Sequence, residues 1–313
     1  MNIPADRKSI CVVGSANIDL IFRVPRLPVP GETFAGYSLH QCMGGKGANQ
    51  AVVAARLGAD VTFVARVGND GFGIEAIEAY KSEGINTSFI QLDDQQPTGT
   101  AAILVDDAAE NSIIVVAGAN ACLRPDHVQA ARSTIENSSV LLSQLETPVN
   151  TTLEAFQIAR AMDVLTILTP APAENVTPEL LELCDICVPN KTEIATIVGQ
   201  QVNSDQDAIH AAELLRDRGV KRVVLTMGGE GVLLVDESGS SHIPATKVDA
   251  VDTTGAGDAF TGGMAVGLGE GFSLEEAAKR AGLVAAVSVA RPGTQPSFPT
   301  LKEVDEWLAN NVV

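Results

Sequence analysis

The amino-acid sequence predicts an α/β fold in which a mostly parallel central sheet is flanked by helices. Short apolar runs rich in β-branched residues, such as 10–14 and 61–68, alternate with stretches of helical periodicity, such as 47–58 and 72–84. This alternation is typical of parallel sheets that helices cover on both faces. Ligands bind such sheets at the carboxyl ends of the strands, so we expect the chemistry at the glycine and asparagine positions that follow them.

The alternation continues to about residue 227, and the last third of the chain is helical. Ser273 with Glu276 and Thr300 with Glu303 have the spacing of capping boxes at the starts of two of these helices. We find no internal repeat and expect a single domain over residues 1–313. Later strand-like runs lie at 140–145, 164–168, 186–189 and 222–227, and helical patterns lie at 152–162 and 211–219.

Two places break the alternation. Residues 18–24 and 33–39 have strand-like composition with no helix between them, and residues 98–105 and 113–116 have the pattern of a hairpin. We predict a small antiparallel sheet, laid over one end of the main domain as a lid. The alternative is that these strands only extend the edge of the main sheet. The lid strands are expected within about residues 17–43 and 97–117.

Composition and charge exclude several classes of protein. Apolar residues make up 45% of the chain and charged residues 19%, as in ordinary globular proteins. The net charge of −18 argues against nucleic acid or an anionic membrane as a partner, because both bind basic surfaces. The sequence shows neither the roughly 18-residue apolar run of a membrane span nor the design of a signal peptide. The five cysteines are scattered along the sequence, which fits a reducing compartment. Cys184 and Cys187 form a C-x-x-C, but they lie in an apolar strand-like run, so we expect them to be buried in the core. We therefore expect a soluble cytoplasmic protein.

The first motif is the run at residues 43–58, which begins with a glycine-rich turn. Gly44 and Gly45 permit a tight turn before a helix. Lys46 and Asn49 then project from one face of the first helical turn, where free backbone N–H groups make a donor-rich site for oxygen atoms. The run is not a Walker A loop. That motif needs glycine six residues before the lysine and Ser or Thr directly after it, whereas this chain has His40 and Gly47 at these positions. The alternative is a glycine turn with a surface lysine.

The second motif is the run at residues 251–263. The backbone N–H groups of Gly255, Ala256 and Gly257 open a helix and form a nest for the charge of a phosphoryl group. Asp258 lies in the first turn, where the helix dipole favours its ionised form, as a proton acceptor requires. The alternative is an acid placed there only for helix stability.

Two further motifs follow later strands. Asn190 and Glu193 fall on one helix face and offer oxygen atoms that suit a hydrated Mg²⁺, but they also have the spacing of a capping box. The loop from Thr226 to Gly231 contains Gly228 and leaves room for a nucleotide against the backbone. The alternative for that loop is a simple hairpin turn.

Taken together and in this order, the motifs resemble those of the ribokinase family of carbohydrate kinases. The resemblance covers nearly the whole chain, from VVGSANID near residue 12 to RPGTQPSFP near residue 291, and GGKGANQA and DTTGAGDAF correspond to the two family signatures. It implies a Rossmann-type three-layer fold and ATP-dependent phosphorylation of D-ribose at the 5-hydroxyl. It also implies Mg²⁺ and a monovalent cation, typically K⁺, as cofactors, and a homodimer that pairs through the lid.

The resemblance also implies residue roles, with Asp258 as the base that takes the proton of the sugar hydroxyl. The implied sugar-binding set is Asn17, Asp19, Gly45, Lys46, Asn49, Glu146 and Asp258. The implied nucleotide set is Asn190, Thr226, Gly228, Gly231, Gly255, Ala256, Gly257 and Gly282. The implied monovalent-cation set is Asp252, Thr254, Ser288, Arg291, Gly293 and Ser297, while Asn190 and Glu193 would govern Mg²⁺.

Charge on the phosphoryl group would be neutralised by Mg²⁺, with Lys46 or Arg291 as further sources of positive charge. Two positions depart from the family pattern: Thr169 stands where asparagine is common, and Gly282 stands where relatives often place a larger side chain beside the adenine.

Other functions stay open from the sequence. The acceptor could be 2-deoxyribose, another furanose or a nucleoside. A non-catalytic sugar or nucleotide sensor is a different class, against which the intact Asp258 and its glycine nest argue. A nicotinamide-dependent dehydrogenase would need G-x-G-x-x-G after the first strand, where this chain has Gly14 alone.

Overall fold

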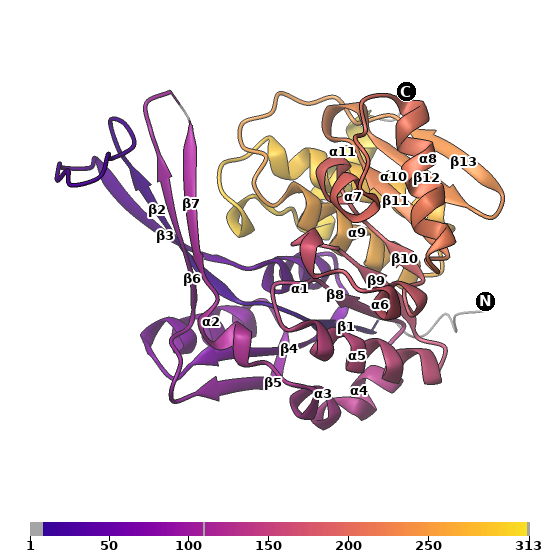
Figure 1. Ribbon diagram of the computed structural model, residues 1–313, viewed down its shortest axis with the longest axis horizontal. Coiled ribbons are helices and arrows are strands. Elements are labelled where there is room, and N and C mark those ends of the chain that lie inside the picture. The colour runs from indigo at the N-terminus through magenta and orange to yellow at the C-terminus, as the bar shows by residue number, and fades with distance from the viewer. Residues whose placement is uncertain (1–8, 109, 312–313) are drawn as a thin grey trace.

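The computed structural model describes residues 9–108 and 110–311, and its main sheet confirms the predicted fold class (Figure 1). Nine strands lie in the order β13-β12-β11-β10-β9-β8-β1-β4-β5. In this described sheet neighbours run parallel, except where β12 pairs with β11 and β13. The strands are β1 (Ser9–Val13), β4 (Asp60–Gly68), β5 (Asn86–Asp93), β8 (Val140–Ser143), β9 (Leu165–Leu168), β10 (Ile186–Cys187), β11 (Arg222–Thr226), β12 (Val232–Asp236) and β13 (Gly239–Ile243).

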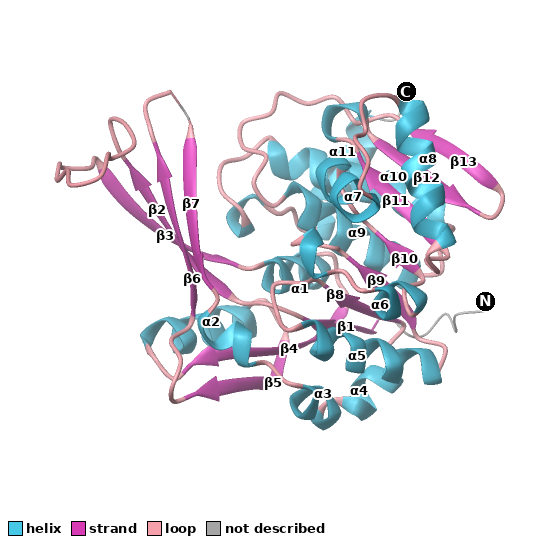
Figure 2. Ribbon diagram, in the orientation of Figure 1, coloured by secondary structure: helices cyan, strands magenta, loops and turns pink. Residues whose placement is uncertain are grey.

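Helices cover both faces of the main sheet (Figure 2). Both predicted capping boxes are present, since Ser273 and Glu276 cap α10 and Thr300 and Glu303 exchange the same bonds before α11. No helix within the described ranges is both long and apolar enough to cross a bilayer. The helices are α1 (Lys46–Arg56), α2 (Gly71–Ser82), α3 (Pro125–Ala130), α4 (Arg132–Glu136), α5 (Val149–Ala161), α6 (Pro178–Glu182), α7 (Lys191–Val198), α8 (Asp205–Asp217), α9 (Ala256–Gly269), α10 (Leu274–Val289) and α11 (Leu301–Asn311).

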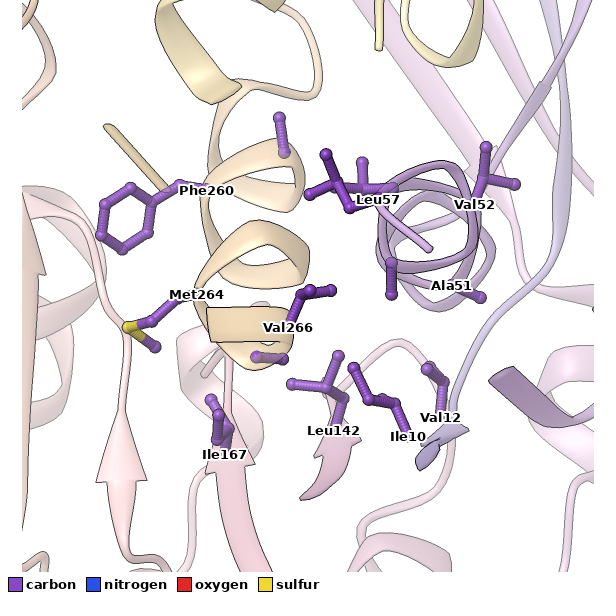
Figure 3. Close-up of a cluster of buried hydrophobic side chains, with 14 of the residues drawn as sticks. Ile10, Val12, Ala51, Val52, Leu57, Leu142, Ile167, Phe260, Met264 and Val266 are labelled. Atoms are coloured by element: carbon purple, nitrogen blue, oxygen red, sulfur yellow. The ribbon is translucent and has the colours of Figure 1, made fainter. Parts of the chain in front are cut away.

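The strands of the main sheet bury both of their faces, as their continuous apolar sequences require. Successive side chains of a strand point to opposite faces, so Ile10 and Val12 lie in the core cluster beside side chains of α1 and α9 (Figure 3). Cys11 and Val13 point to the other face, where they belong to a second core cluster that also contains side chains of α3, α5 and α8. Burying each such side chain stabilises the fold by about 1.5–3 kcal/mol before chain entropy is counted. The cysteines of the C-x-x-C lie in the second cluster, fully buried and free, as predicted.

A second, four-stranded sheet stands apart from the main one, at the upper left of Figure 1. Its order is β3-β2-β6-β7, and none of these strands pairs with the main sheet, so the predicted second sheet is confirmed as separate from the main one. The outer pairs are antiparallel, whereas the central β2–β6 pair is parallel. The strands are β2 (Asn17–Arg23), β3 (Ser38–Gly44), β6 (Gly99–Val105) and β7 (Asn111–Val116).

The strand predicted at residues 33–39 was wrong in its bounds. β3 begins at Ser38, which pairs with Arg23, and continues to Gly44, which pairs with Asn17. Composition alone suggested the earlier segment, but the register with β2 decides which residues pair. The consequence is functional, because β3 leads directly into the glycine turn at the start of α1.

Candidate functional site

Asp258 is buried in the first turn of α9, with an exposed fraction of only 6%. Two amides from the first turns of α1 hold its carboxylate. Asn49 Nδ2 donates to Oδ2 at 2.9 Å, and Gln50 Nε2 donates to Oδ1 at 3.0 Å. The two glycine-rich motifs of the sequence therefore meet at one carboxylate.

Two further amides orient the first pair. Gln295 Nε2 donates to Asn49 Oδ1 at 3.0 Å, and Gln144 Nε2 donates to Gln50 Oε1 at 2.6 Å. Sequence reasoning missed Gln50, Gln144 and Gln295. The signal for Gln50 was its position four residues after Lys46, which places it on the same helix face as Lys46.

The pKa of Asp258 is shifted in the direction opposite to the one that the helix dipole predicts. Burial raises the pKa of Asp258, and this outweighs the opposing effects of Lys46 and of the bonds from Asn49 and Gln50. The ionised form is therefore less favoured than the dipole alone would suggest, which makes the carboxylate a stronger proton acceptor. Asp258 in turn raises the pKa of the Lys46 ammonium, so that this group stays charged.

Most of the predicted sugar-binding residues gather around the turn at Gly45. Gly45 has a φ of +88°, and a Cβ there would lie 2.8 Å from the backbone N of Asn17, so only glycine fits. The next residue, Lys46, donates its backbone N–H to Glu146 Oε2 at 3.1 Å. Burial, followed by Glu146 and Asp258, raises the pKa of Asp19 to about 6, which shows that these acids share one region.

Asn17 has a partner that sequence reasoning missed. Asn120 Nδ2 donates to Asn17 Oδ1 at 2.7 Å and to the carbonyl of Ala16 at 3.1 Å. Asn120 Oδ1 also accepts from the backbone N–H of Ala16 at 2.9 Å. Asn120 thus fixes the Asn17 amide. The sequence feature that could have identified Asn120 is its place in the AGAN run.

A cavity of about 760 Å³ opens beside Asp258. Lys46 and Asp258 line it together with every residue of the predicted nucleotide set. A Cβ at Gly282 would meet no atom within 4 Å, so this wall of the cavity is open. The residues of that set that it brings together are Asn190, Thr226, Gly228, Gly231, Gly255, Ala256, Gly257 and Gly282.

The predicted nest is smaller than the sequence suggested. The backbone N–H of Ala256 donates to the carbonyl of Thr253 at 3.2 Å and is already used within the turn. The N–H groups of Gly255 and Gly257 remain the candidates for contact with a phosphoryl group.

Asn190 and Glu193 form the capping box that was the alternative to a metal site. Asn190 Oδ1 accepts from Glu193 N at 2.8 Å, and Glu193 Oε2 accepts from Asn190 N at 2.8 Å. Both residues also line the cavity, and burial raises the pKa of Glu193. The capping role does not remove them from the cavity, but it uses the side-chain oxygen of Asn190 and one of the two carboxylate oxygens of Glu193.

The predicted monovalent-cation residues come from the segment before α9 and from the end of α10 with the segment after it, and these two parts of the chain meet at Asp252. Its Oδ1 accepts from the backbone N of Thr254 at 2.9 Å, and its Oδ2 accepts from that of Gly293 at 3.0 Å. The carbonyl of Ser288 accepts from Arg291 N at 3.1 Å, and Ser297 Oγ donates to the carbonyl of Thr294 at 2.7 Å. The described residues contain no cluster of three or more His, Cys, Asp or Glu side chains that could hold a metal ion.

Arg291 does not supply positive charge to the cavity, contrary to the expectation. Its guanidinium pairs with Glu303 at 2.8 Å, and it is not among the residues that line the cavity. Lys46 is the cation of the predicted set that lies beside Asp258.

The chain is similar to known proteins over almost its full length. The family model described as pfkB family carbohydrate kinase matches residues 7–301. Ribokinase of Haemophilus influenzae is 42% identical over 302 residues, which are 96% of this chain and 99% of that protein. Deoxyribokinase of Salmonella typhi is 36% identical over 303 residues, which are 96% of this chain and 99% of that protein.

Solved structures agree with the sequence matches. A ribokinase from Thermotoga maritima has a TM-score of 0.89 and 39% identity, and the match covers 96% of this chain and 99% of that one. Arabidopsis thaliana ribokinase, solved with ribose and ATP, has a TM-score of 0.89 and 32% identity over 96% of this chain and 98% of that one. The two signatures, the fold and these similarities lead to one conclusion: the chain belongs to the pfkB family of carbohydrate kinases.

Proposed function

We propose that the chain transfers the terminal phosphoryl group of ATP to the 5-hydroxyl of D-ribose, giving ADP and ribose 5-phosphate. The position of Asp258 carries the proposal. Its carboxylate lines the cavity that the predicted nucleotide residues form, and it bonds to Asn49 of the predicted sugar set. A base between two substrate sites can take the acceptor proton while the phosphoryl group approaches along the line of attack. The similar ribokinases, one of them solved with ribose and ATP, support this pair of substrates.

In this proposal the chain contributes three actions. Asp258 accepts the hydroxyl proton. The N–H groups of Gly255 and Gly257, at the positive end of α9, stabilise charge on the phosphoryl group. Lys46 stays protonated beside Asp258 and adds positive charge in an otherwise acidic protein. Phosphoryl transfer depends mainly on such positioning and charge neutralisation.

Cations complete the proposed site. Mg²⁺ bound to the ATP phosphates would neutralise their charge, and Glu193 would meet it through water because Asn190 N–H already occupies one carboxylate oxygen. A monovalent cation, K⁺ in this proposal, would lie at the loops that Asp252 joins, with Thr254, Ser288, Arg291, Gly293 and Ser297 around it. Carboxylate, hydroxyl and main-chain oxygens at these loops are the kind of donor that such an ion needs.

The acceptor is tested by a rate comparison. ADP release would be measured with ribose, 2-deoxyribose and nucleosides as acceptors, each with and without K⁺. We expect the highest kcat/KM for ribose, with activation by K⁺. The deoxyribokinase relative makes 2-deoxyribose the second candidate acceptor, and a higher kcat/KM for it would favour that candidate. A nucleoside turned over well above either sugar would overturn the proposal, and absence of turnover would favour a sensor.

We also propose that two chains pair through the lid. The edge strand β7 exposes a continuous apolar run, in which Ile113, Ile114, Val115 and Val116 each have exposed fractions of 54–62%. An uncovered apolar edge strand is a liability that proteins manage by covering it. A second lid would cover this strand.

A further inference from the structure

Asp258 is reached from the protein core by a chain of buried side-chain amides. Gln144, which follows β8, donates to Gln50 at 2.6 Å, and Gln50 donates to Asp258 Oδ1 at 3.0 Å. Gln50 Nε2 also donates to Thr169 Oγ1 at 3.0 Å. Both N–H bonds and the carbonyl of the Gln50 amide are therefore used, which fixes the direction in which the amide faces. Both glutamines have an exposed fraction of 0%.

Packing alone does not account for Gln144. Within the described ranges no donor reaches its Oε1 atom, and a buried amide oxygen without a partner is costly. A Cβ at Gly14 would lie 2.1 Å from that same atom, so the Gln144 side chain fits only because residue 14 is glycine. An apolar side chain would fill this space without the polar cost.

We propose that Gln50, oriented by Gln144, is a positioning residue that holds the Asp258 carboxylate in the geometry from which it takes the acceptor proton. The inference rests on the proposed role of Asp258 as base. With Asn49 on one oxygen and Gln50 on the other, the carboxylate cannot rotate, and its remaining lone pairs keep a fixed direction. Gln144 touches neither substrate site and acts only through Gln50.

Other charged groups around Asp258 also affect its pKa, and a test by pH dependence must take them into account. Lys46 of α1 lowers the pKa of Asp258, and Glu146 raises it. Asp19 of β2 and Glu193 of α7 also interact electrostatically with Asp258 and, as like charges, oppose its ionisation. The Gln50 bond is among the contacts that lower this pKa, so its loss moves the pKa further upward.

The test is the pH dependence of kcat/KM for ribose in Gln50→Met, Gln144→Met and the double variant. Methionine keeps the length of glutamine and removes its hydrogen bonds. We expect Gln50→Met to lower kcat/KM roughly ten- to a hundredfold and to move its acid limb to higher pH. Gln144→Met should do the same to a smaller degree, with the KM for ribose nearly unchanged. Because both residues act through one bond, the double variant should lose no more than Gln50→Met alone.

Two further variants separate positioning from general damage. Thr151→Val removes a buried 2.8 Å hydrogen bond to Leu123 O, away from the site, and should lower Tm without moving the pH profile. Gly14→Ala changes neither amide and would place its Cβ 2.1 Å from Gln144 Oε1 and 3.0 Å from Gly47 Cα, so it mainly displaces the Gln144 side chain. It replaces Gln144→Met in the test if that variant does not fold, and it should show the same upward move of the acid limb.

The outcomes are distinct. Losses that multiply in the double variant, or a folded Gln144→Met with an unshifted acid limb, would overturn the positioning role. Asp258→Asn is measured alongside: substantial turnover there contradicts the proposed base itself. An inactive Asp258→Asn variant combined with unshifted glutamine variants contradicts only the inference about Gln50 and Gln144.

Discussion

Asn49 of α1 and Asp258 of α9 are 209 positions apart in the sequence, yet a 2.9 Å hydrogen bond joins their side chains. The same Asn49 accepts from Gln295 at 3.0 Å, so its amide can only present N–H to the carboxylate. This contact joins the two glycine-rich motifs and sets the geometry on which the proposed chemistry depends.

Asn49→Ala should therefore lower kcat/KM for ribose by about a hundredfold, because the carboxylate loses one of its two anchors. Asn49 also belongs to the proposed sugar set, so both a lower kcat and a higher KM are expected. Steady-state kinetics measure this. Asn86→Ala is the control, since Asn86 lies on β5 and bonds Thr62 instead. A variant at position 49 as active as the control would contradict the role of Asn49.

The acids of the site should make stability depend on pH. The pKa of Asp19 is raised from its ordinary value of 3.8 to about 6, by burial first and then by Glu146 and Asp258. A raised folded-state pKa contributes stability that is complete below about pH 4 and is lost as the pH rises through about 6. Asp19→Asn should therefore raise the free energy of unfolding at pH 7.5, by at most about 3 kcal/mol, and leave it unchanged near pH 3.5.

Urea unfolding at the two pH values checks this expectation. Asp207→Asn is the control with the opposite sign, because the side-chain bond from Ser204 lowers the pKa of the half-buried Asp207. Asp207→Asn removes this stabilised carboxylate and should therefore lower the free energy of unfolding at pH 7.5. An Asp19→Asn variant that is less stable than the parent at pH 7.5 would contradict the shared burial of these acids.

Gly282 should tolerate a side chain. It lies inside α10, and a Cβ there meets nothing within 4 Å. Gly282→Ala should stabilise the protein by about 0.5–1 kcal/mol, because alanine favours the helix. The added methyl group faces the cavity, so the KM for ATP should fall about two- to fourfold while the KM for ribose stays constant. Gly71→Ala in α2 is the matched control, also free of contacts but outside the cavity. An unchanged KM for ATP in Gly282→Ala would place the adenine elsewhere.

Pairing through the lid predicts a mutant phenotype. The wild-type chain should sediment at about twice its mass of 32.6 kDa. Ile114→Asp places a charge on the exposed run of β7 and should give a monomer, because an interface core does not tolerate an unpaired charge. Met162→Asp changes a similarly exposed apolar residue next to α5 and should remain a dimer. A wild-type monomer at micromolar concentration would refute the pairing.

Much of the fold was predictable because its signals are local. The alternation of strands and helices, the hairpin of β6 and β7 and the capping boxes each depend on residues close in sequence. The start of β3 was not predictable, because its pairing with β2 decides it. The pKa direction of Asp258 was also out of reach, since it depends on burial by distant segments, and that burial outweighs the local helix dipole.

The residues of the candidate site also fall into those that local sequence predicts and those that it does not. Residues within a motif, such as Lys46 and Asn49, were found because their spacing places them on one helix face. Gln144 and Gln295 were missed because their contacts exist only once distant segments pack together. Arg291 was misjudged for the same reason: its partner Glu303 lies on α11 and turns the guanidinium away from the cavity.

The most direct test of the account is Asp258→Asn, which keeps the shape of the side chain and removes its capacity to accept a proton. ADP release with ribose and ATP should fall by about 10²–10⁴-fold, while calorimetry should show ribose binding within a few-fold of the parent. A variant that turns over ribose at close to the parental rate would contradict Asp258 as the base.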